Sequence, residues 1–544
     1  MAELKVGSSI KIEYGDEAKI IGELGSGAQG IVYLVEYKGK KYALKWYFYD
    51  KLREPNAFRT NIRNNIEDKS PSDKFLWPQY LTEGQQNGSF GYLMDLIPSN
   101  YVGLTDILNT YKIEQIKGTN QVKKVPVKFT SLEAVVNAAI NIVIAFRELH
   151  RDGKSYQDLN DGGFYIDVQT GDLLVCDCDN IAPEGDNYGI AGMPGYMAPE
   201  VVRGIAKPDV QTDKYSLAVV LFKLLFRHDP LEGAKVLKSV CLHEAADLKH
   251  YGKEAVFIYD PEDTSNRPVK GVHDNVINLW RVYPEYIRDA FIRSFTTGIK
   301  NPNHRIIENE WQKLFVRLRS DIIHCECGRV RFSNAYINKD GIYICPSCSN
   351  KFLSIKFDDI DIPVFAGQKL YRCFTAKGND DFNTVTATIM ENKKHPGVMG
   401  MKNNTQDTWK CTLPNGEIKE VEPGKTRALG KGMTIDFGKS IIAKIDEDFK
   451  KTAEKLINEE YFNEEGGKDM PLNLHKDEEI TIDEFKEYDF DPLEVKPISK
   501  KNLVIFFLVD TSGSMSGKKI GTLNTTMEEL LPELRGLGGA TTDI

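Results

Sequence analysis

The stretch that decides the fold is residues 22–46, GELGSGAQGIVYLVEYKGKKYALKW. Apolar residues alternate with polar residues or glycines on both sides of a turn at residues 38–40, which predicts successive strands over residues 18–46. Three glycines lie where the first predicted strand turns into the second, namely Gly25, Gly27 and Gly30. Glycines between two strands let the backbone approach phosphate groups closely, and Lys45 on the strand after next can hold them.

Helical periodicity replaces the strand pattern further along the chain. Apolar residues follow i, i+3, i+4 spacing from Leu132 to Leu149, and a second apolar helix is predicted from about Asp213 to Phe226. Strands followed by helices indicate an α+β fold with two lobes.

Length and charge limit the class of protein. At 544 residues the chain should hold several domains, because single cores stop growing near ~250–300 residues. The net charge of −9 argues against a nucleic-acid partner. The N-terminal sequence has no apolar core like that of a signal peptide, and the apolar run 503–509 is far shorter than the ~20 residues that cross a bilayer. We therefore expect a cytoplasmic protein without a membrane partner.

Two carboxylates follow the glycine-rich strands at long range. Asp158 lies in YQDLNDGGF and Asp177 in LLVCDCDN. The stretches GMPGYMAPE, QTDKYSLAVVLFKLL and NPNHRIIENEW follow in that order. Each motif is weak alone, but the ordered set resembles the protein kinase family over about residues 18–317, which we assign to a two-lobed kinase-like domain at 1–319.

The resemblance implies an ATP-dependent enzyme that transfers the γ-phosphate to Ser or Thr of a protein substrate. Lys45 would hold the phosphates, Asp158 would orient and deprotonate the attacking hydroxyl, and Asp177 would hold magnesium. Asp213 would brace the catalytic loop, and Arg305 would pair with Glu200. The nucleotide site is expected to comprise Gly25, Ser26, Gly27, Gly30, Val32, Lys45 and Asp95.

Several residues depart from the family pattern. Gly163 stands where the family has an Asn that binds the second magnesium, Asn160 replaces a Lys, and Gln157 replaces the Arg that docks a phosphate of the activation loop. Asn61 falls at the place of the small-lobe Glu that pairs with the lysine, with Glu54 and Glu67 as displaced candidates.

Asp179 follows two residues after Asp177, and we expect the two carboxylates to share a magnesium ion because oxygen ligands suit it. The alternative function is that of a pseudokinase, a nucleotide-binding scaffold that assembles partners without phosphotransfer.

Four cysteines form two pairs that flank 17 residues: Cys325, Cys327, Cys345 and Cys348. Four thiolates in paired spacing suit tetrahedral zinc and predict a structural zinc ribbon over 320–356. His324 beside the first pair is an alternative ligand. DNA binding by this module has little basic support beyond Arg329 and Arg331.

Residues 360–445 predict a small β-sandwich-like domain with a hairpin turn at Asn415–Gly416. The stretch resembles the later strands of a forkhead-associated (FHA) domain at Asn403, Trp409, Gly416, Gly432 and Phe437. FHA domains bind phosphothreonine peptides, but only Arg372 is present of the residues that this requires, so we expect a structural role.

Residues 446–500 are acidic and predict a helical start followed by a flexible linker. The final segment, 501–544, resembles the start of a von Willebrand factor A (VWA) domain, a truncated α/β piece. Its candidate metal ligands are Asp510, Ser512 and Ser514. Together the pieces resemble bacterial signalling systems of tellurite-resistance-type gene clusters, which implies a VWA protein and a metal-dependent phosphatase as partners.

Overall fold

The computed structural model describes residues 4–27, 29–116, 122–189, 192–238, 244–338, 340–358, 360–446 and 490–498. The chain divides into two compact units, residues 1–499 and 500–544, and all described residues lie in the first. Most of the acidic linker and the VWA-like motif of Asp510, Ser512 and Ser514 therefore lie outside the described residues.

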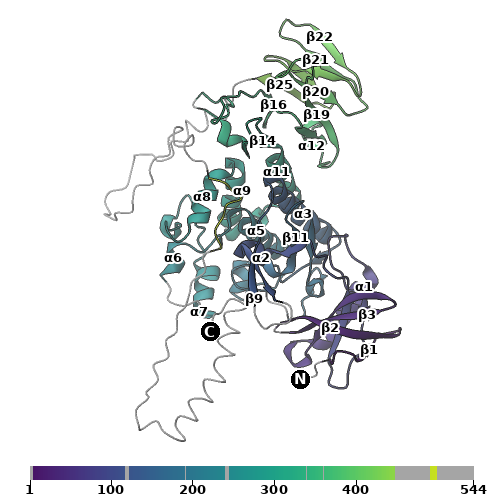
Figure 1. Cartoon of the computed structure of the whole chain (residues 1–544). Coiled ribbons are helices and arrows are strands. Elements are labelled where there is room, and N and C mark those ends of the chain that lie inside the picture. Colours follow the sequence, from purple (N-terminus) through teal and green to yellow (C-terminus); the bar gives the residue numbers. More distant parts are fainter. Residues whose placement is uncertain are drawn as a thin grey trace, which may run out of the picture. The chain divides into compact units, whose positions relative to one another are not determined.

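The N-terminal part is an antiparallel sheet with helix α1 beside it, as Figure 1 shows. The strand order is β1-β2-β3-β4-β6-β5, which confirms the strands predicted over 18–46. The bounds are β1 Ser9–Lys11, β2 Glu17–Gly27, β3 Gly30–Tyr37, β4 Lys40–Tyr47, α1 Pro55–Asp68, β5 Tyr80–Leu81 and β6 Phe90–Met94. Glu13 holds α1 to the sheet through Arg59 at 2.5 Å and Arg63 at 2.9 Å.

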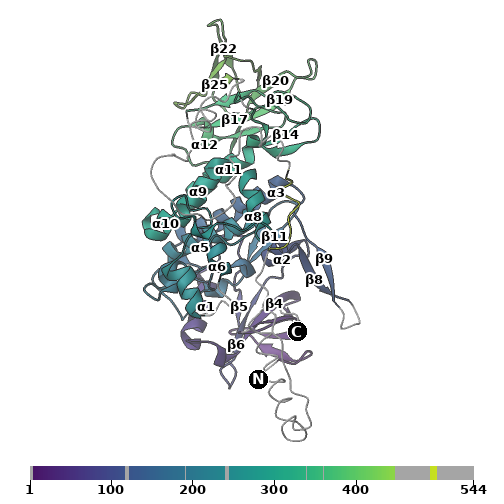
Figure 2. The ribbon, with the colours of Figure 1, turned by 90° about the vertical axis from the view of Figure 1, so that its left-hand side faces the viewer.

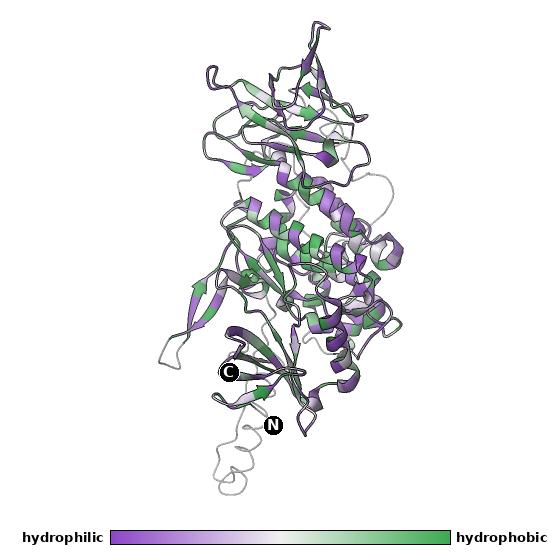
Figure 3. Ribbon diagram, turned by 90° about the vertical axis from the view of Figure 1, so that its right-hand side faces the viewer, coloured by the Kyte–Doolittle hydropathy of each residue, from purple (hydrophilic) through white to green (hydrophobic). Residues whose placement is uncertain are grey.

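The middle part is mainly helical and has two long buried helices. α3 (Leu132–Arg151) begins where the sequence predicts, with the Ser131 hydroxyl accepting a hydrogen bond from the Ala134 amide at 3.1 Å. α5 (Val210–Phe226) begins three residues before the predicted Asp213, because Asp209 and Thr212 form a capping box. Apolar residues concentrate in this helical region in the hydropathy colouring of Figure 3.

Shorter elements surround α3 and α5. The helices are α2 Leu104–Asn109, α4 Pro199–Val202, α6 Ala234–Leu237, α7 Glu244–Asp247, α8 Asp274–Val282, α9 Glu285–Phe295, α10 Thr297–Lys300 and α11 Glu308–Ser320. The strands are β7 Tyr101–Gly103, β8 Tyr111–Gln115, β9 Val122–Pro126, β10 Lys154–Ser155, β11 Phe164–Asp167, β12 Leu173–Val175 and β13 Ala182–Pro183. Strands β8 and β9 form a separate two-stranded hairpin, visible in Figure 2.

The cysteine-rich part follows α11 and begins with the hairpin of β14 (Ile322–His324) and β15 (Val330–Phe332). Two antiparallel sheets come next. One has the order β17 Asp361–Pro363, β16 Ser354–Lys356, β25 Ile442–Asp446, β24 Thr434–Asp436, β21 Trp409–Thr412 and β22 Ile418–Val421. The other has the order β18 Lys369–Tyr371, β19 Val385–Glu391, β20 Met399–Asn403 and β23 Thr426–Ala428, with the short helix α12 Arg372–Thr375.

The hairpin turn predicted at Asn415–Gly416 is confirmed. It joins β21 to β22, and the Leu413 amide donates to the Glu417 carbonyl at 2.8 Å. Gly416 has a φ of +86°, a conformation that glycine adopts at no steric cost.

One apolar core runs from the helices into the two C-terminal sheets. It includes Phe222 and Phe315 in the helical part, Phe332 in the cysteine-rich part, and Ile389 and Ile445 in the sheets. No helix within the described ranges has both the length and the apolar content to cross a membrane.

Candidate functional site

Lys45 on β4 meets two carboxylates that lie far away in the sequence. Its Nζ donates to Asp177 Oδ1 at 2.7 Å and to both carboxylate oxygens of Asp179 at 3.0 Å. Burial alone would lower the pKa of Lys45, but the two carboxylates raise it well above its ordinary value. The lysine is therefore a fixed cation at the site.

The two carboxylates have different surroundings. The Asp177 side chain is 44% exposed, and its backbone is left-handed with a φ of +52°. Asp179 is completely buried, and it also accepts hydrogen bonds from the Tyr47 hydroxyl and from the Tyr92 hydroxyl, the latter at 2.8 Å. Burial alone would raise the pKa of Asp179, but Lys45 and the two tyrosines bring it below its ordinary value.

Helix α1 provides amides at the place where the family has a glutamate. Asn61 Nδ2 and Asn65 Nδ2 each donate to the Ile181 carbonyl at 2.8 Å, directly after the Asp177–Asn180 turn. Glu54 and Glu67, the displaced candidates, are both exposed. The ion-pair partners that Lys45 has among the described residues are therefore Asp177 and Asp179, and α1 contacts the turn instead.

Asp158 lies near the same charges, on the loop between β10 and β11. Asn160 Nδ2 donates to its backbone carbonyl at 2.9 Å and to its Oδ1 at 3.3 Å. Burial raises the pKa of Asp158, the Asn160 hydrogen bond opposes this, and the charges of Asp177 and Asp179 raise it further. A carboxylate with a raised pKa beside a lysine is suited to accept a proton.

The side chain of Tyr156 explains why a glycine stands at position 163. A Cβ at this position would lie 2.6 Å from the hydroxyl oxygen of Tyr156, which itself donates to the Cys176 carbonyl at 2.5 Å. Tyr156 is 1% exposed. A side chain at 163 would therefore require this buried tyrosine to shift.

Helix α5 anchors the loop that carries Asp158. Asp213 on α5 accepts hydrogen bonds from the Tyr156 amide at 2.6 Å and from the Gln157 amide at 3.1 Å. His150 contacts Asp213 Oδ2 at 3.2 Å and Glu308 Oε1 at 2.7 Å. Burial alone would lower the pKa of His150, but the two carboxylates raise it to about 9.

Neutral hydrogen bonds connect Gln157 to residues 186 and 187. The Gln157 side chain donates to the Asp186 carbonyl at 2.5 Å and accepts from Asn187 Nδ2 at 2.9 Å. Further along the chain, Arg305 pairs with Glu200 at 2.7 Å, as the resemblance implies.

The three glycines Gly25, Gly27 and Gly30 differ in the space around them. A Cβ at Gly30 would lie 1.9 Å from the Trp46 carbonyl oxygen, so the packing of β3 on β4 requires glycine there. At Gly25 and Gly27 a Cβ would meet no atom of the described residues within 4 Å, so the fold itself does not require glycine. Ser26 is exposed, Val32 pairs with Lys45 across β3 and β4, and Asp95 pairs with Lys40 at 2.6 Å.

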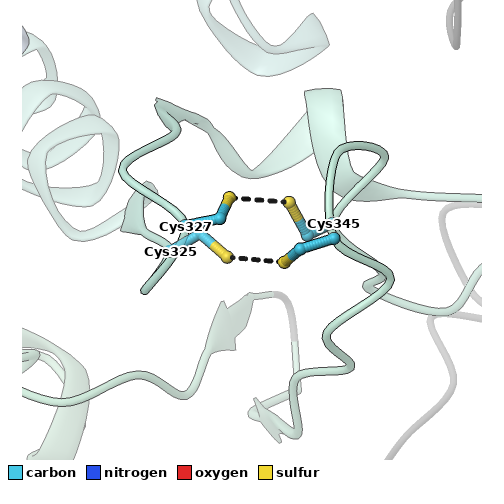
Figure 4. Close-up of side chains that lie close together, drawn as sticks. Cys325, Cys327 and Cys345 are labelled. Atoms are coloured by element: carbon cyan, nitrogen blue, oxygen red, sulfur yellow. Dashed lines mark hydrogen bonds between the residues drawn. The ribbon is translucent and has the colours of Figure 1, made fainter.

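The four cysteines converge in a second site, shown in Figure 4. Cys325 Sγ lies 3.4 Å from Cys348 Sγ, Cys327 Sγ lies 3.7 Å from Cys345 Sγ, and all four sulfurs lie within 4.8 Å of one another. Thiolates around zinc at about 2.3 Å stand about 3.8 Å apart in a tetrahedron, so the arrangement fits such an ion. His324 contacts Glu133 instead of joining the cluster.

Sequence reasoning missed Tyr47 and Tyr92 as partners of Asp179. They lie 132 and 87 residues from it in the chain, and the local sequence around each tyrosine predicts at most a strand. The pairing of Asn61 and Asn65 with the Ile181 carbonyl was also missed, although their spacing of four places both on one face of a helix.

Comparisons with known proteins locate the similarity in the helical part. Residues 106–283 match the family model described as protein kinase domain. The chain is 26% identical over 225 residues to a probable serine/threonine-protein kinase of Dictyostelium discoideum, an alignment that covers 39% of this chain and 24% of that protein. It is 33% identical over 102 residues to human beta-adrenergic receptor kinase 1 and 30% over 99 residues to mouse protein kinase C delta type, each covering 18% of this chain and 14% of the relative.

The chain thus spans about a quarter or less of the length of these curated relatives. The matched range contains Asp158, Asp177 and Asp179 but not the glycine-rich strands or Lys45, which the structure brings to them. These findings support a protein serine/threonine kinase, and they make residues 106–283 similar to a protein kinase domain.

Proposed function

We propose that the chain is an ATP- and magnesium-dependent protein kinase that transfers the γ-phosphate to the hydroxyl of a Ser or Thr in a protein substrate. The observation that supports this most directly is the contact of Lys45 with Asp177 at 2.7 Å, which joins the glycine-rich sheet to the matched domain close to Asp158. The serine/threonine preference rests on the relatives.

The residues at this place fit a nucleotide. Gly25 and Gly27 leave open space on the strand ends, which suits close approach of phosphate oxygens to backbone amides. Val32, Leu96 and Leu174 are partly buried apolar side chains packed on the cluster around Tyr47 and Tyr92, and an apolar base would cover them.

The residues also fit one magnesium ion. Asp177 is partly exposed, and Lys45 engages only one of its carboxylate oxygens among the described residues. When bound, magnesium would neutralise charge on the phosphate oxygens. Lys45 would hold the phosphates, and Asp158 would orient the substrate hydroxyl and take its proton.

For Asp179 we propose a role as the partner of Lys45. The carboxylate is completely buried and is contacted by Lys45, Tyr47 and Tyr92. It therefore takes the role that a small-lobe glutamate has in the family, since no glutamate of α1 pairs with Lys45 among the described residues. The prediction that Asp179 also binds magnesium can be checked by the dependence of nucleotide affinity on magnesium concentration in Asp179→Asn.

Phosphotransfer from radiolabelled ATP, with magnesium or manganese, tests the proposal. We expect the wild type to label itself or a generic protein substrate, and Asp158→Asn to reduce labelling by at least ~10²-fold. Asp73→Asn, which changes an exposed carboxylate outside the proposed site, is the matched control. Equal labelling by the wild type and Asp158→Asn would exclude the catalytic assignment.

The second candidate function is a pseudokinase scaffold, and the Gly163–Tyr156 contact favours it. The space for a second metal ligand is filled by the tyrosine hydroxyl, 2.6 Å from a Cβ at 163. Nucleotide binding by the wild type with labelling no higher than that of Asp158→Asn would identify a scaffold.

We further propose that the four cysteines bind one structural zinc ion, as their convergence supports. Metal analysis of the full chain should find one zinc per molecule, and Cys345→Ser should remove it. A bacterial signalling role, with a VWA protein and a metal-dependent phosphatase as partners, is supported by sequence resemblance alone. Copurification with either protein from the source cell would test it.

A further inference from the structure

The segment 490–498, with the sequence FDPLEVKPI, lies against the helical part although it follows the C-terminal sheets in the chain. It is the yellow segment of Figures 1 and 2. Asp491 shapes its start, since the Leu493 amide donates to Asp491 Oδ1 at 3.0 Å and the Glu494 amide to the Asp491 carbonyl at 2.9 Å. The sequence pattern predicted a linker here, and these nine residues instead have defined contacts.

One side chain of α8, that of Asn275, forms hydrogen bonds with the backbone of the segment. Asn275 Oδ1 accepts from the Lys496 amide at 3.1 Å, and Asn275 Nδ2 donates to the Lys496 carbonyl at 2.7 Å. Two residues later the Ile498 amide donates to the Leu108 carbonyl of α2 at 3.2 Å. This alternation resembles the way an extended peptide pairs with a receptor.

Charged side chains of the segment face side chains of opposite charge on the rest of the protein. Glu494 pairs with Lys128 at 3.1 Å, and Lys496 pairs with Asp274 at 3.6 Å. Asp491 lies 4.0 Å from Arg331 on β15. These exposed pairs contribute little energy, but they specify the direction and register of the segment.

Apolar contacts supply the attraction. Phe490, Leu493, Val495 and Ile498 are partly buried and pack against the main core. Two prolines, Pro492 and Pro497, restrict the backbone and so reduce the entropy lost on docking.

We propose that Leu108, Lys128, Asp274, Asn275 and Arg331 form a peptide-docking site whose occupant is residues 490–498 of the same chain. The site selects an extended segment with the pattern of DPLEVK, residues 491–496. In this pattern two acidic residues, Asp491 and Glu494, are each followed by an apolar residue, and a lysine ends it. Because the occupant belongs to the same molecule, modest intrinsic affinity suffices for docking. The inference is independent of whether the kinase domain transfers phosphate.

Hydrogen–deuterium exchange of the full chain tests the contact. We expect the amides of Lys496 and Ile498 to exchange at least ~10-fold more slowly than in a synthetic peptide of residues 488–500. Asn275→Ala should bring the Lys496 amide close to the rate of the free peptide. Asn278→Ala, on the same helix but outside the described contacts with the segment, should leave the protection unchanged.

A binding assay tests recognition. The full chain with Leu493→Asp and Val495→Asp should release its own segment and bind a fluorescent peptide of residues 488–500, whereas the wild type should bind it at least ~10-fold more weakly. Adding Asn275→Ala to the double variant should abolish binding. Three results would overturn the proposal: unprotected amides in the wild type, protection that survives Asn275→Ala, or protection lost on dilution, which would assign the segment to a second copy.

Discussion

At position 163 the choice of residue is limited by the hydroxyl of Tyr156. The residues at 163 and 156 are thus sterically linked, because a Cβ at 163 and the Tyr156 oxygen would be 2.6 Å apart. The tyrosine donates to the Cys176 carbonyl just before Asp177, so it contacts the turn that carries Asp177 from inside the core. A family-like Asn at 163 would require the tyrosine to shift.

We predict that Gly163→Ala lowers the free energy of unfolding by about 1–3 kcal/mol, because the added carbon overpacks a rigid site. In a Tyr156→Phe background, which lacks the oxygen, the same change should cost clearly less. Urea unfolding of the four proteins measures the coupling. Gly22→Ala is the control, since its Cβ would meet only Leu34 Cβ, at 3.9 Å. Equal costs in both backgrounds would contradict the steric link.

The two acids beside Lys45 should differ in their effect on stability. Asp179→Asn removes a completely buried partner of a buried ammonium and should lower the free energy of unfolding by about 3 kcal/mol or more. Asp177→Asn changes a carboxylate that is 44% exposed, so solvent screening should limit the cost to about 1 kcal/mol. Unfolding in metal-free buffer with a chelator measures both. A larger loss for Asp177→Asn would argue against Asp179 as the main partner of Lys45.

At the scale of elements, α3, α5 and α11 meet in one buried ion cluster. His150 of α3 lies between Asp213 of α5 and Glu308 of α11, and Asp213 holds two amides of the catalytic loop. His150 therefore links Glu308 of α11 to the carboxylate of α5 that holds the loop.

This cluster predicts a pH dependence of stability. The pKa of His150 is raised from 6.5 to about 9 in the folded chain, so its contribution is complete below pH 6.5 and is lost as the pH rises through 9. The expected loss is on the order of 3 kcal/mol between these values. Thermal unfolding from pH 6 to 10 should show it for the wild type and not for His150→Gln. His304→Gln, at an exposed site, should behave as the wild type.

Elements with strong periodicity could be predicted from the sequence, and contacts between distant elements could not. The strands over 18–46 and the start of α3 at Ser131 follow from local alternation, spacing and capping. The pairing of Asp179 with Tyr47 and Tyr92 depends on how β4 and β6 pack on the turn, which no local pattern encodes. The docking of 490–498 was missed for the same reason, because an acidic composition indicates a linker when its receptor is unknown.

At the scale of the whole described unit, the cysteine cluster belongs to a small apolar cluster of its own, and neighbouring residues of the same part join the main core. Tyr283 of the helical part packs against Phe332 of β15 in a tilted arrangement, with ring centroids 5.1 Å apart. Tyr286 donates to Asp321 at 2.6 Å, and Gln368 donates to the Ser320 carbonyl at 2.6 Å, which ties α11 to the first C-terminal strands. The kinase domain and the sheets therefore share buried contacts through this region.

This arrangement predicts that zinc stabilises more than the module that binds it. A chelator, or Cys345→Ser at a completely buried cysteine, should lower the melting temperature of the kinase domain together with that of the sheets, as one shifted transition. Differential scanning calorimetry of the full chain with and without chelator makes the measurement, and Cys373→Ser, outside the cluster, is the control. Two separate transitions, of which only the smaller responds to the chelator, would show that the continuous core does not couple the parts. A single shifted transition would instead mean that metal binding at the cysteines stabilises the helical part and the sheets as one cooperative unit.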